Sequence, residues 1–322
     1  MNRSGRPRQS RRPLLGVGGT LLALAATACT SSGGTTPPPS PATVTVTQSA
    51  SSPSATPTPT PKPTPLGKPV RVRSPIGDGA TFGVGMPLII RFGVSPTSKV
   101  AFQKAAVVTV NGKPAGGAWF WENVSRGDPV EVHYRPREFW PAHAKIHVGL
   151  PVKGLSAGRG LSFANDLTLD YSIGAYHYAR VDSRALRMQV YNEGKLVRTM
   201  KVSLGKAATP TYTGTKVVME KNRVERMIGP GYNKLVPWSV RITNSGEFIH
   251  AAPWNTGIGA RSTSNGCTNL STADATWFFT FARPGDVVQY PNAAGTTMPS
   301  WDGFGDWNLT WVQWQAGGAL QR

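Results

Sequence analysis

The sequence predicts a mainly β protein with two successive β domains, preceded by an export signal and a spacer and followed by an aromatic-rich tail. Three observations support this prediction. Short apolar or alternating runs, separated by turn residues, recur along the chain from about Pro69. One later segment has the start and stop signals of a helix. A Ser-, Thr- and Pro-rich stretch precedes the first of these runs and has too few apolar residues to form a core.

Residues 1–28 have the organisation of an export signal peptide. A basic region ends at Arg11-Arg12, an apolar stretch follows, and Ala26-Thr27-Ala28-Cys29 resembles a bacterial lipobox. This pattern predicts a lipoprotein acylated at Cys29. Paired arginines are typical of twin-arginine export, ordinary secretory export fits as well, and an uncleaved signal anchor stays open. Each alternative places the body of the protein outside the cytoplasm, and the lipid-anchored form would lie on the outer face of the cytoplasmic membrane.

The charge balance is strongly basic. Lys and Arg number 35 against 16 Asp and Glu, a formal net charge of +19. Such an excess suits an anionic partner, for example the cell wall, a membrane surface or nucleic acid. The basic residues are scattered and form no helix-turn-helix, zinc-finger or RNA-binding signature, so we expect no nucleic-acid partner. A basic surface without any specific partner stays open.

Residues 29–66 predict an extended linker, because Ser, Thr, Pro, Gly, Ala and Val make up nearly all of them. Residues 67–170 then predict a β-sandwich of short strands, with a turn at Asn111-Gly112. In this domain His133, His143 and His147 have no acidic or thiol partner at metal-ligand spacing, and we expect solvated or core histidines. The predicted strands are Leu88–Phe92, Ala106–Val110, Trp119–Trp121, Val130–Tyr134 and Lys145–Leu150.

Residues 171–292 predict a second domain that is mostly β with one clear helix. Ser271 is the expected helix cap, Asp274 follows at capping-box spacing, and Arg283-Pro284-Gly285 ends the helix. A hairpin turn is expected at Asn192–Lys195. The predicted strands are Ile173–Val181, Ala185–Tyr191, Leu196–Leu204, Lys216–Glu220, Trp238–Thr243 and Phe248–Ala251.

Residues 293–322 carry many aromatic side chains, which could stack on sugar rings. We favour a C-terminal subdomain that packs its indoles on the second domain. The residues concerned are Trp301, Phe304, Trp307, Trp311 and Trp314.

Cys267 and His250 are the candidate catalytic pair. Cys267 is the one thiol outside the signal region, and Gly266 before it permits a tight turn and close approach of a substrate. The capped helix begins four residues later, and a helix N-terminus favours the thiolate. His250, at the end of a predicted strand, could accept the thiol proton. No acidic residue lies between Glu247 and Asp274, so a backbone carbonyl is the expected orienting group for the imidazole.

Around this pair the sequence resembles the actinobacterial L,D-transpeptidases, cysteine-dependent enzymes that cross-link peptidoglycan. The resemblance lies in His250-Ala251-Ala252-Pro253-Trp254, in Ser264-Asn265-Gly266-Cys267-Thr268-Asn269 and in the Trp-Asp-Gly-Phe-Gly-Asp-Trp-Asn segment that starts at Trp301. It covers nearly all of the chain, from the lipoprotein-like start onward. It implies an immunoglobulin-like β-sandwich followed by an L,D-transpeptidase catalytic β-domain.

The resemblance also implies roles for individual residues. Cys267 would attack a donor tetrapeptide stem and release D-alanine, and an acceptor amine would resolve the thioester into a 3→3 cross-link. His250 would act as general base and then acid, and backbone amides around Gly266 would hold the oxyanion. Tyr232, Ser264 and Asn269 match substrate-site positions, and Thr211–Gly214 matches a structural stretch. Carbapenems are expected to acylate the cysteine.

One departure concerns Asn265, because the family usually has histidine there. Asparagine can hydrogen-bond but cannot take a proton near neutral pH, so we expect it to position substrate. No metal or organic cofactor is implied, because beyond the candidate pair there is no ligand cluster or phosphate loop. Two other hypotheses stay open. One is an L,D-carboxypeptidase, with water replacing the acceptor amine, and the other is a catalytically silent wall-binding lipoprotein.

Overall fold

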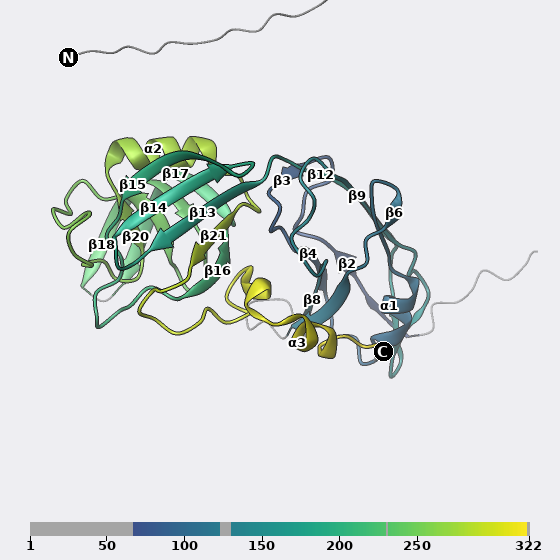
Figure 1. Cartoon of the computed structure of the whole chain (residues 1–322). Coiled ribbons are helices and arrows are strands. Elements are labelled where there is room, and N and C mark those ends of the chain that lie inside the picture. The colour runs from purple at the N-terminus through teal and green to yellow at the C-terminus, as the bar shows by residue number, and fades with distance from the viewer. Residues whose placement is uncertain (1–66, 123–129, 230, 321–322) are drawn as a thin grey trace, which may run out of the picture. The chain divides into compact units, whose positions relative to one another are not determined.

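The computed structural model describes residues 67–122, 130–229 and 231–320. The predicted signal peptide, the lipidation at Cys29 and the spacer over residues 29–66 lie outside these described residues. Within them no helix is both long and apolar enough to cross a bilayer. The described chain forms two β-rich domains in sequence, and a tail with two short helices follows them (Figure 1).

The first domain is a β-sandwich, as predicted. One sheet has the order β2-β4-β8-β7 and the other β3-β12-β9-β5-β6, while a small third sheet has the order β1-β11-β10. A short helix, α1 (Val100–Ala105), was not predicted. The strands are β1 Lys68–Val70, β2 Val72–Arg73, β3 Thr81–Phe82, β4 Leu88–Phe92, β5 Val107–Val110, β6 Lys113–Pro114, β7 Ala118–Glu122, β8 Val130–Arg135, β9 Lys145–Leu150, β10 Ser156–Gly158, β11 Leu161–Phe163 and β12 Leu167–Ile173.

The sandwich has an aromatic core. Phe92 stacks on Trp121 and meets Phe102 edge-on, at centroid distances of 5.4 and 5.2 Å. Phe102 and Phe163 are also fully buried in this cluster. The alternating runs that predicted the strands supply these inward side chains, because successive residues of a strand face opposite sides of the sheet. The predicted turn is confirmed by positive φ at Asn111 and Gly112.

The second domain combines a five-stranded sheet, β15-β14-β13-β21-β16, with a four-stranded sheet, β17-β18-β19-β20. Helix α2 (Thr272–Phe281) contacts β18, β19 and β20, and Figure 1 shows it at the top of the domain. Val240, Ile249 and Phe278 are buried in the shared core. The strands are β13 His177–Asp182, β14 Arg187–Asn192, β15 Lys195–Lys201, β16 Gly214–Val217, β17 Glu220–Gly229, β18 Tyr232–Arg241, β19 Phe248–Ala251, β20 Thr268–Leu270 and β21 Val287–Tyr290.

Two predicted strands each run across two strands of the structure. The run Ile173–Val181 is two strands, because β12 ends at Ile173 in the sandwich and β13 begins at His177. The predicted domain boundary at residue 171 therefore falls inside β12. The run Lys216–Glu220 is also divided, since β16 ends at Val217 in one sheet and β17 begins at Glu220 in the other. In both places the chain changes sheets, and an uninterrupted sequence run does not reveal that change.

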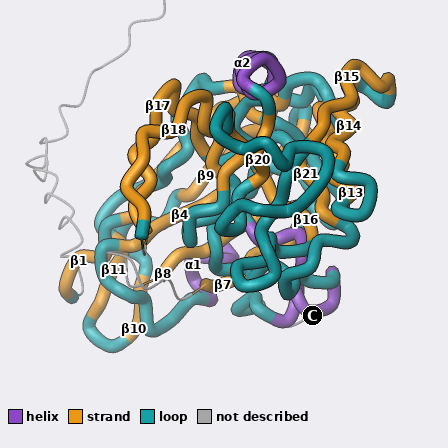
Figure 2. Tube along the Cα trace, turned by 90° about the vertical axis from the view of Figure 1, so that its left-hand side faces the viewer, coloured by secondary structure: helices purple, strands orange, loops and turns teal. Residues whose placement is uncertain are grey.

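The long β17–β18 hairpin was missed except for the second half of β18. Its strands pair from Glu220 opposite Arg241 to Gly229 opposite Tyr232, and Figure 2 traces them as a paired ribbon. β17 has a polar majority and no buried residue, so it lacks the alternating apolar pattern on which a strand prediction depends.

The tail packs on both domains, whereas packing on the catalytic domain alone was predicted. It contains η1 (Gly305–Asn308) and α3 (Trp311–Ala316). Asn308 exchanges hydrogen bonds with the backbone of Thr215, which ties the tail to the second domain. Trp314 is fully buried, stacks on Phe120 at 4.9 Å and donates Nε1 to the Ala118 carbonyl at 2.9 Å. The missed part of the interface is therefore with the sandwich.

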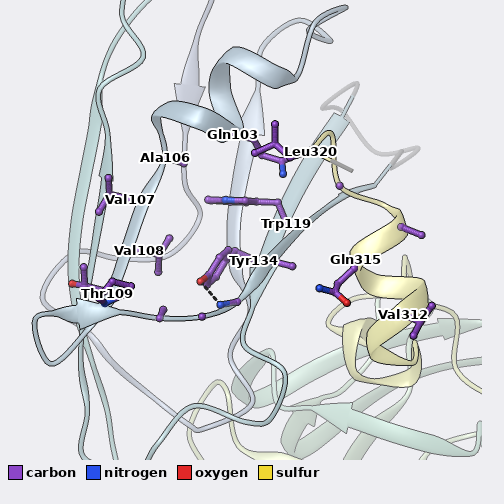
Figure 3. A pocket seen from close by; sticks show the side chains of 17 residues that line it. Gln103, Ala106, Val107, Val108, Thr109, Trp119, Tyr134, Val312, Gln315 and Leu320 are labelled. Atoms are coloured by element: carbon purple, nitrogen blue, oxygen red, sulfur yellow. Dashed lines mark hydrogen bonds between the residues drawn. The ribbon is translucent and has the colours of Figure 1, made fainter. Parts of the chain in front are cut away.

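A cavity of about 740 Å³ lies between the sandwich strands and α3 (Figure 3). Trp119 and Tyr134 project into it, and the Tyr134 hydroxyl accepts a hydrogen bond from the Gly117 amide at 2.7 Å. Val312 and Gln315 of the tail line the other side. The tail therefore does not fill the whole space beside the sheet, and the cavity that remains has a largely apolar lining.

Each histidine of the sandwich has a carboxylate partner that sequence spacing did not reveal. His133 is buried between Asp306 of the tail and Glu131, at 2.6 and 3.0 Å. His147 meets Asp170 at 2.9 Å in an exposed pair. His143 is also exposed, with Nε2 2.5 Å from a carboxylate oxygen of Glu193. Most of these partners are far away in the sequence, and only tertiary folding brings them close.

Candidate active site

The predicted catalytic residues share one cavity of about 390 Å³ in the second domain. Strands β17, β18, β19 and β20 and the loops around them supply its walls. The lining residues are Lys206, Met227, Tyr232, Lys234, Val236, His250, Trp254, Asn255, Thr256, Arg261, Thr263, Ser264, Asn265, Cys267 and Asn269. All the predicted site residues except Gly266 and Cys29 line this cavity. Gly266 is buried beside Cys267, and Cys29 lies outside the described residues.

Cys267 stands in a tight turn immediately before β20. Gly266 has φ +115°, a conformation that glycine adopts readily and other residues avoid. The Ser264 hydroxyl accepts from the Gly266 amide at 3.2 Å and donates to the Cys267 carbonyl at 2.6 Å. Thr211 donates its hydroxyl to the Gly266 carbonyl at 2.7 Å. The turn is therefore held by side chains from both sides.

The pKa of the Cys267 thiol is raised, whereas the sequence predicted that the following helix would favour the thiolate. Burial raises its pKa to about 11, although the Phe248 amide opposes that rise. Its Sγ lies 3.7 Å from the Gly246 carbonyl oxygen, a partner that favours the protonated form. The strand β20 separates the thiol from the first turn of α2, and the effect of a helix terminus falls off within about one turn.

His250 lies on β19 and is buried. Its Nδ1 donates to the Ala251 carbonyl at 2.8 Å, which confirms the predicted backbone orienting group. Burial lowers the pKa of His250 to about 4, while the bond to Ala251 opposes that shift. The imidazole is therefore neutral at physiological pH, with its proton on Nδ1 and a lone pair on Nε2.

A chain of amides reaches this lone pair. β19 and β20 pair in parallel so that His250 is opposite Asn269, and Asn269 donates Nδ2 to His250 Nε2 at 3.0 Å. Asn255 donates to Asn269 Oδ1 at 2.9 Å, which fixes the orientation of that amide. Asn255 in turn accepts from the Thr263 hydroxyl at 3.0 Å. Asn269 thus holds the imidazole directly, and the sequence had indicated only a polar position near the site.

A buried ion pair beneath the turn at Cys267 was missed. Lys216 on β16 is fully buried, and its Nζ contacts Glu247 Oε2 and lies 4.0 Å from the centre of the Tyr290 ring. Glu247 also accepts from the Tyr212 amide at 2.8 Å. A Cβ added to Gly266 would lie 3.7 Å from the Glu247 carboxylate, so this pair is packed directly under the turn. Burial lowers the pKa of Lys216 and raises that of Glu247.

The other side chains of the cavity come from separate segments. Tyr232 begins β18, and Asn265 is exposed on the loop before the nucleophile. Sequence reasoning missed Trp254, whose ring centre lies 6.3 Å from that of His250, and Lys234, whose Nζ lies 4.7 Å from the Trp254 ring. Trp254 belongs to the segment that carries the resemblance, but no local signal indicates that Lys234 faces the same cavity.

Among residues 67–122, 130–229 and 231–320, no group of three His, Cys, Asp or Glu side chains is arranged to hold a metal ion. A neutral thiol and a neutral imidazole line this cavity, which is a starting state for nucleophilic acyl transfer with general base assistance. A cavity that opens to solvent beside the thiol could admit an extended peptide.

Comparison with known families agrees with this chemistry. Residues 176–289 match the family described as the L,D-transpeptidase catalytic domain (YkuD), and residues 42–156 match the bacterial Ig domain family. The first match contains both Cys267 and His250. The second begins within the predicted linker and ends before the predicted end of the sandwich at residue 170.

Similar proteins include L,D-transpeptidase 2 of Mycobacterium tuberculosis (strain CDC 1551 / Oshkosh), 35% identical over 76% of this chain and 61% of that protein. L,D-transpeptidase 5 of Mycobacterium tuberculosis (strain ATCC 25618 / H37Rv) is 33% identical over 79% of this chain and 57% of that protein. The chain thus spans about three fifths of the length of these two relatives.

Solved structures agree with this match. An LD transpeptidase, LdtMt1, in complex with imipenem superposes with a TM-score of 0.58 at 27% identity, covering 68% of this chain and 97% of the other. An L,D-transpeptidase from Mycobacterium smegmatis gives 0.56 at 26% identity, covering 70% and 100%. The chain is thus similar to L,D-transpeptidases over about three quarters of its length, with a match to a bacterial Ig domain followed by a match to the YkuD catalytic domain.

Proposed function

We propose that this protein is an L,D-transpeptidase that forms 3→3 cross-links in peptidoglycan through a thioester on Cys267. The observation that carries the proposal is the cavity that Cys267 and His250 both line, within a domain that matches the family. The donor is a tetrapeptide stem that ends in D-alanine, and the acceptor is a side-chain amine of a second stem.

In the acylation step, the thiol proton passes to His250 Nε2 and Sγ bonds to the carbonyl carbon of the third stem residue. Asn269 donates to that same lone pair in the resting protein, so its bond must give way before the proton arrives. The tetrahedral oxyanion needs backbone donors. Because Ser264 already accepts from the Gly266 amide, we assign the oxyanion chiefly to the amide of Cys267.

Collapse of the intermediate breaks the bond to D-alanine, whose amine takes the proton from His250 Nε2. The acceptor amine then attacks the thioester, His250 takes its proton, and the thiolate leaves and is reprotonated. Tyr232, Ser264 and Asn265 shape the substrate path in this proposal. Asn265 positions substrate by hydrogen bonds and carries no proton, because the carboxamide does not titrate near neutral pH.

The proposed site of action is the outer face of the cytoplasmic membrane. The lipobox-like segment before Cys29 and the basic charge of the chain support a lipid-anchored protein that works against anionic wall polymers. We also propose that carbapenems acylate Cys267, because an L,D-transpeptidase similar in fold was solved in complex with imipenem.

The test is to incubate the full-length protein in detergent with a disaccharide-tetrapeptide and to measure the masses of intact protein and products. We expect a thioester on Cys267, released D-alanine and a 3→3 dimer. Cys267→Ala should give neither adduct nor dimer, and Asn265→His should keep both. An adduct with tripeptide alone would indicate the carboxypeptidase, and a folded protein without adduct would indicate the silent wall-binding protein.

A further inference from the structure

The catalytic cavity has a cationic rim made of Lys206, Lys234 and Arg261. Lys206 follows β15, Lys234 lies on β18, and Arg261 belongs to the loop between β19 and β20. All three residues are exposed and line the cavity, and no Asp or Glu lines it with them. A ligand that approaches Cys267 therefore meets three positive charges from three separate segments.

The backbones of these residues are anchored while their charged groups stay available. The Lys206 amide donates to the Ser264 carbonyl, and the Arg261 amide donates to the Gly257 carbonyl, both at 2.9 Å. The Arg261 carbonyl accepts from the Ser203 hydroxyl at 2.7 Å. Among the described residues, none of the three cations makes a salt bridge to a carboxylate. The ammonium group of Lys234 lies over the face of the Trp254 ring instead.

Some other cations of the same domain are neutralised. Arg198 pairs with Asp274 at 2.7 Å, Arg241 pairs with Glu220 at 2.7 Å, and Lys216 pairs with Glu247. The cations around the cavity thus differ from these in having no acidic partner. Unpaired positive charge around a binding cavity raises the local concentration of anionic ligands and strengthens their binding.

The three cations carry more positive charge than one carboxylate would neutralise. In the proposed donor, the departing D-alanine supplies one carboxylate, and it leaves from the carbonyl that Cys267 attacks. A second carboxylate would lie close to the same carbonyl if the side chain of the third residue carried it. We propose that Lys206, Lys234 and Arg261 select a donor stem with both carboxylates free. This inference rests on the proposed transpeptidase function and names the donor class of that site.

The experiment compares two disaccharide-tetrapeptide donors that differ in one group, a free carboxylate or a carboxamide on the side chain of the third residue. The readout is kcat/KM for thioester formation on the full-length protein, followed by intact-protein mass. We expect the dianionic donor to be preferred by about fivefold to tenfold at low ionic strength, the effect of one or two partly exposed ion pairs. The preference should shrink as salt is added, because salt screens exposed charges.

Three variants test whether these residues cause the preference for the donor with a free side-chain carboxylate. Lys206→Gln, Lys234→Gln and Arg261→Gln should each raise KM for the dianionic donor and narrow its advantage, while kcat changes little. Lys195→Gln is the matched control, since Lys195 is an exposed cation at the start of β15 outside the cavity, and it should keep the full preference. Iodoacetamide alkylation of Cys267 should stay unchanged in all four, which would show an intact nucleophile.

The two levels of the hypothesis fail in different ways. Thioester formation at the same rate with both donors would overturn the selection of a dianionic stem and leave the transpeptidase standing. A preference that persists undiminished in a variant combining Lys206→Gln, Lys234→Gln and Arg261→Gln would also overturn it. A folded protein that neither donor acylates would remove the proposed function and the selection together.

Discussion

At the scale of single residues, the Cys267 thiol is protonated in the resting site. Burial favours the neutral form of both partners, so the pKa of the Cys267 thiol is raised to about 11 and that of the His250 imidazole is lowered to about 4. A thiolate–imidazolium pair at rest would need the opposite order of the two pKa values. Proton transfer is therefore expected to accompany attack on the donor.

This ordering can be tested by alkylating the substrate-free protein with iodoacetamide at a series of pH values. Only the thiolate reacts, so the rate for Cys267 should rise by about tenfold per pH unit from pH 7 to 10. Intact-protein mass follows the reaction, and Cys267→Ala is the control for other sites. A rate that is already level from pH 6 upward would show a preformed thiolate instead.

The Lys216–Glu247 pair offers a second residue-scale prediction. Glu247 raises the pKa of the neighbouring thiol and Lys216 lowers it. Replacing the carboxylate in Glu247→Gln should therefore lower the pKa of Cys267 and speed alkylation at pH 7 by severalfold. Lys216→Met should slow it.

The double variant Lys216→Met with Glu247→Gln leaves no unpaired buried charge and should restore a pKa close to that of the original protein. We expect this double variant to be more stable than either single variant, because one buried ion without its partner is strongly destabilising. If the pH dependence of alkylation is the same in all folded variants, the pair has no electrostatic role at the nucleophile.

At the scale of elements, α2 supports the strand that follows the nucleophile. Its first turn is capped by Ser271, whose hydroxyl accepts from the Asp274 amide at 3.1 Å, while Arg198 binds the Asp274 carboxylate. Ser271 directly follows β20, which carries Asn269. The cap therefore connects helix stability to the position of the imidazole's partner.

Removing this cap should be measurable. Ser271→Ala leaves an amide of the first turn without its acceptor, and we expect a loss of about 1 kcal/mol in the free energy of unfolding. Urea denaturation followed by tryptophan fluorescence would report it. Thr280→Ala, which changes an exposed residue of the same helix, is the control and should change stability by less than about 0.5 kcal/mol. Equal effects of the two changes would contradict the capping role.

The β17–β18 hairpin shows how alternation divides one element between two environments. Met227, Tyr232 and Lys234 face the catalytic cavity, since all three line it. Ile228 and Leu235 are exposed and belong to the opposite face, because successive residues of a strand point to opposite sides. A register shift of one residue would exchange these sets and remove Tyr232 and Lys234 from the site.

At the scale of the whole molecule, a buried charge cluster fixes the tail to the sandwich. His133 lies between Glu131 and Asp306, and Glu131 also binds Arg91. Burial lowers the pKa of His133, but the two carboxylates outweigh it and raise the pKa to about 10. Glu122 faces the same cluster, and burial raises the pKa of its carboxyl. His133 is therefore a positively charged imidazolium in the folded protein at neutral pH.

This cluster predicts a stability that falls in alkali. A histidine whose pKa is raised on folding stabilises the protein fully below its unfolded pKa of about 6.5, and that contribution is lost as pH rises toward 10. Thermal unfolding measured from pH 6 to 10 should show a falling midpoint. Asp306→Asn should lower the midpoint at pH 6 and flatten its pH dependence.

The matched control is Asp170→Asn, which removes an exposed carboxylate beside His147. It should leave the slope between pH 6 and 10 unchanged, because an exposed pair contributes little. An unaltered slope in Asp306→Asn would contradict the role of the buried cluster.

The sequence by itself determined the local features of this protein. Strand runs such as Leu88–Phe92 and Phe248–Ala251 have the predicted bounds, and the helix capped by Ser271 lies where its signals place it. The candidate pair Cys267 and His250 could be found because each lies in a short segment with its own pattern. These features depend on neighbours a few residues apart, and a sequence displays such neighbours directly.

Only the tertiary structure decided what those segments meet. Parallel pairing of β19 and β20 sets Asn269 against His250, and the packing of β16 under the turn brings Lys216 to Glu247. The tail reaches the sandwich through Asp306 and His133, which are 173 residues apart. Burial raises the pKa of the Cys267 thiol, which is opposite to the direction expected from the helix that follows it. Such contacts join positions far apart in the chain, and their energies depend on exclusion of water, which no local pattern records.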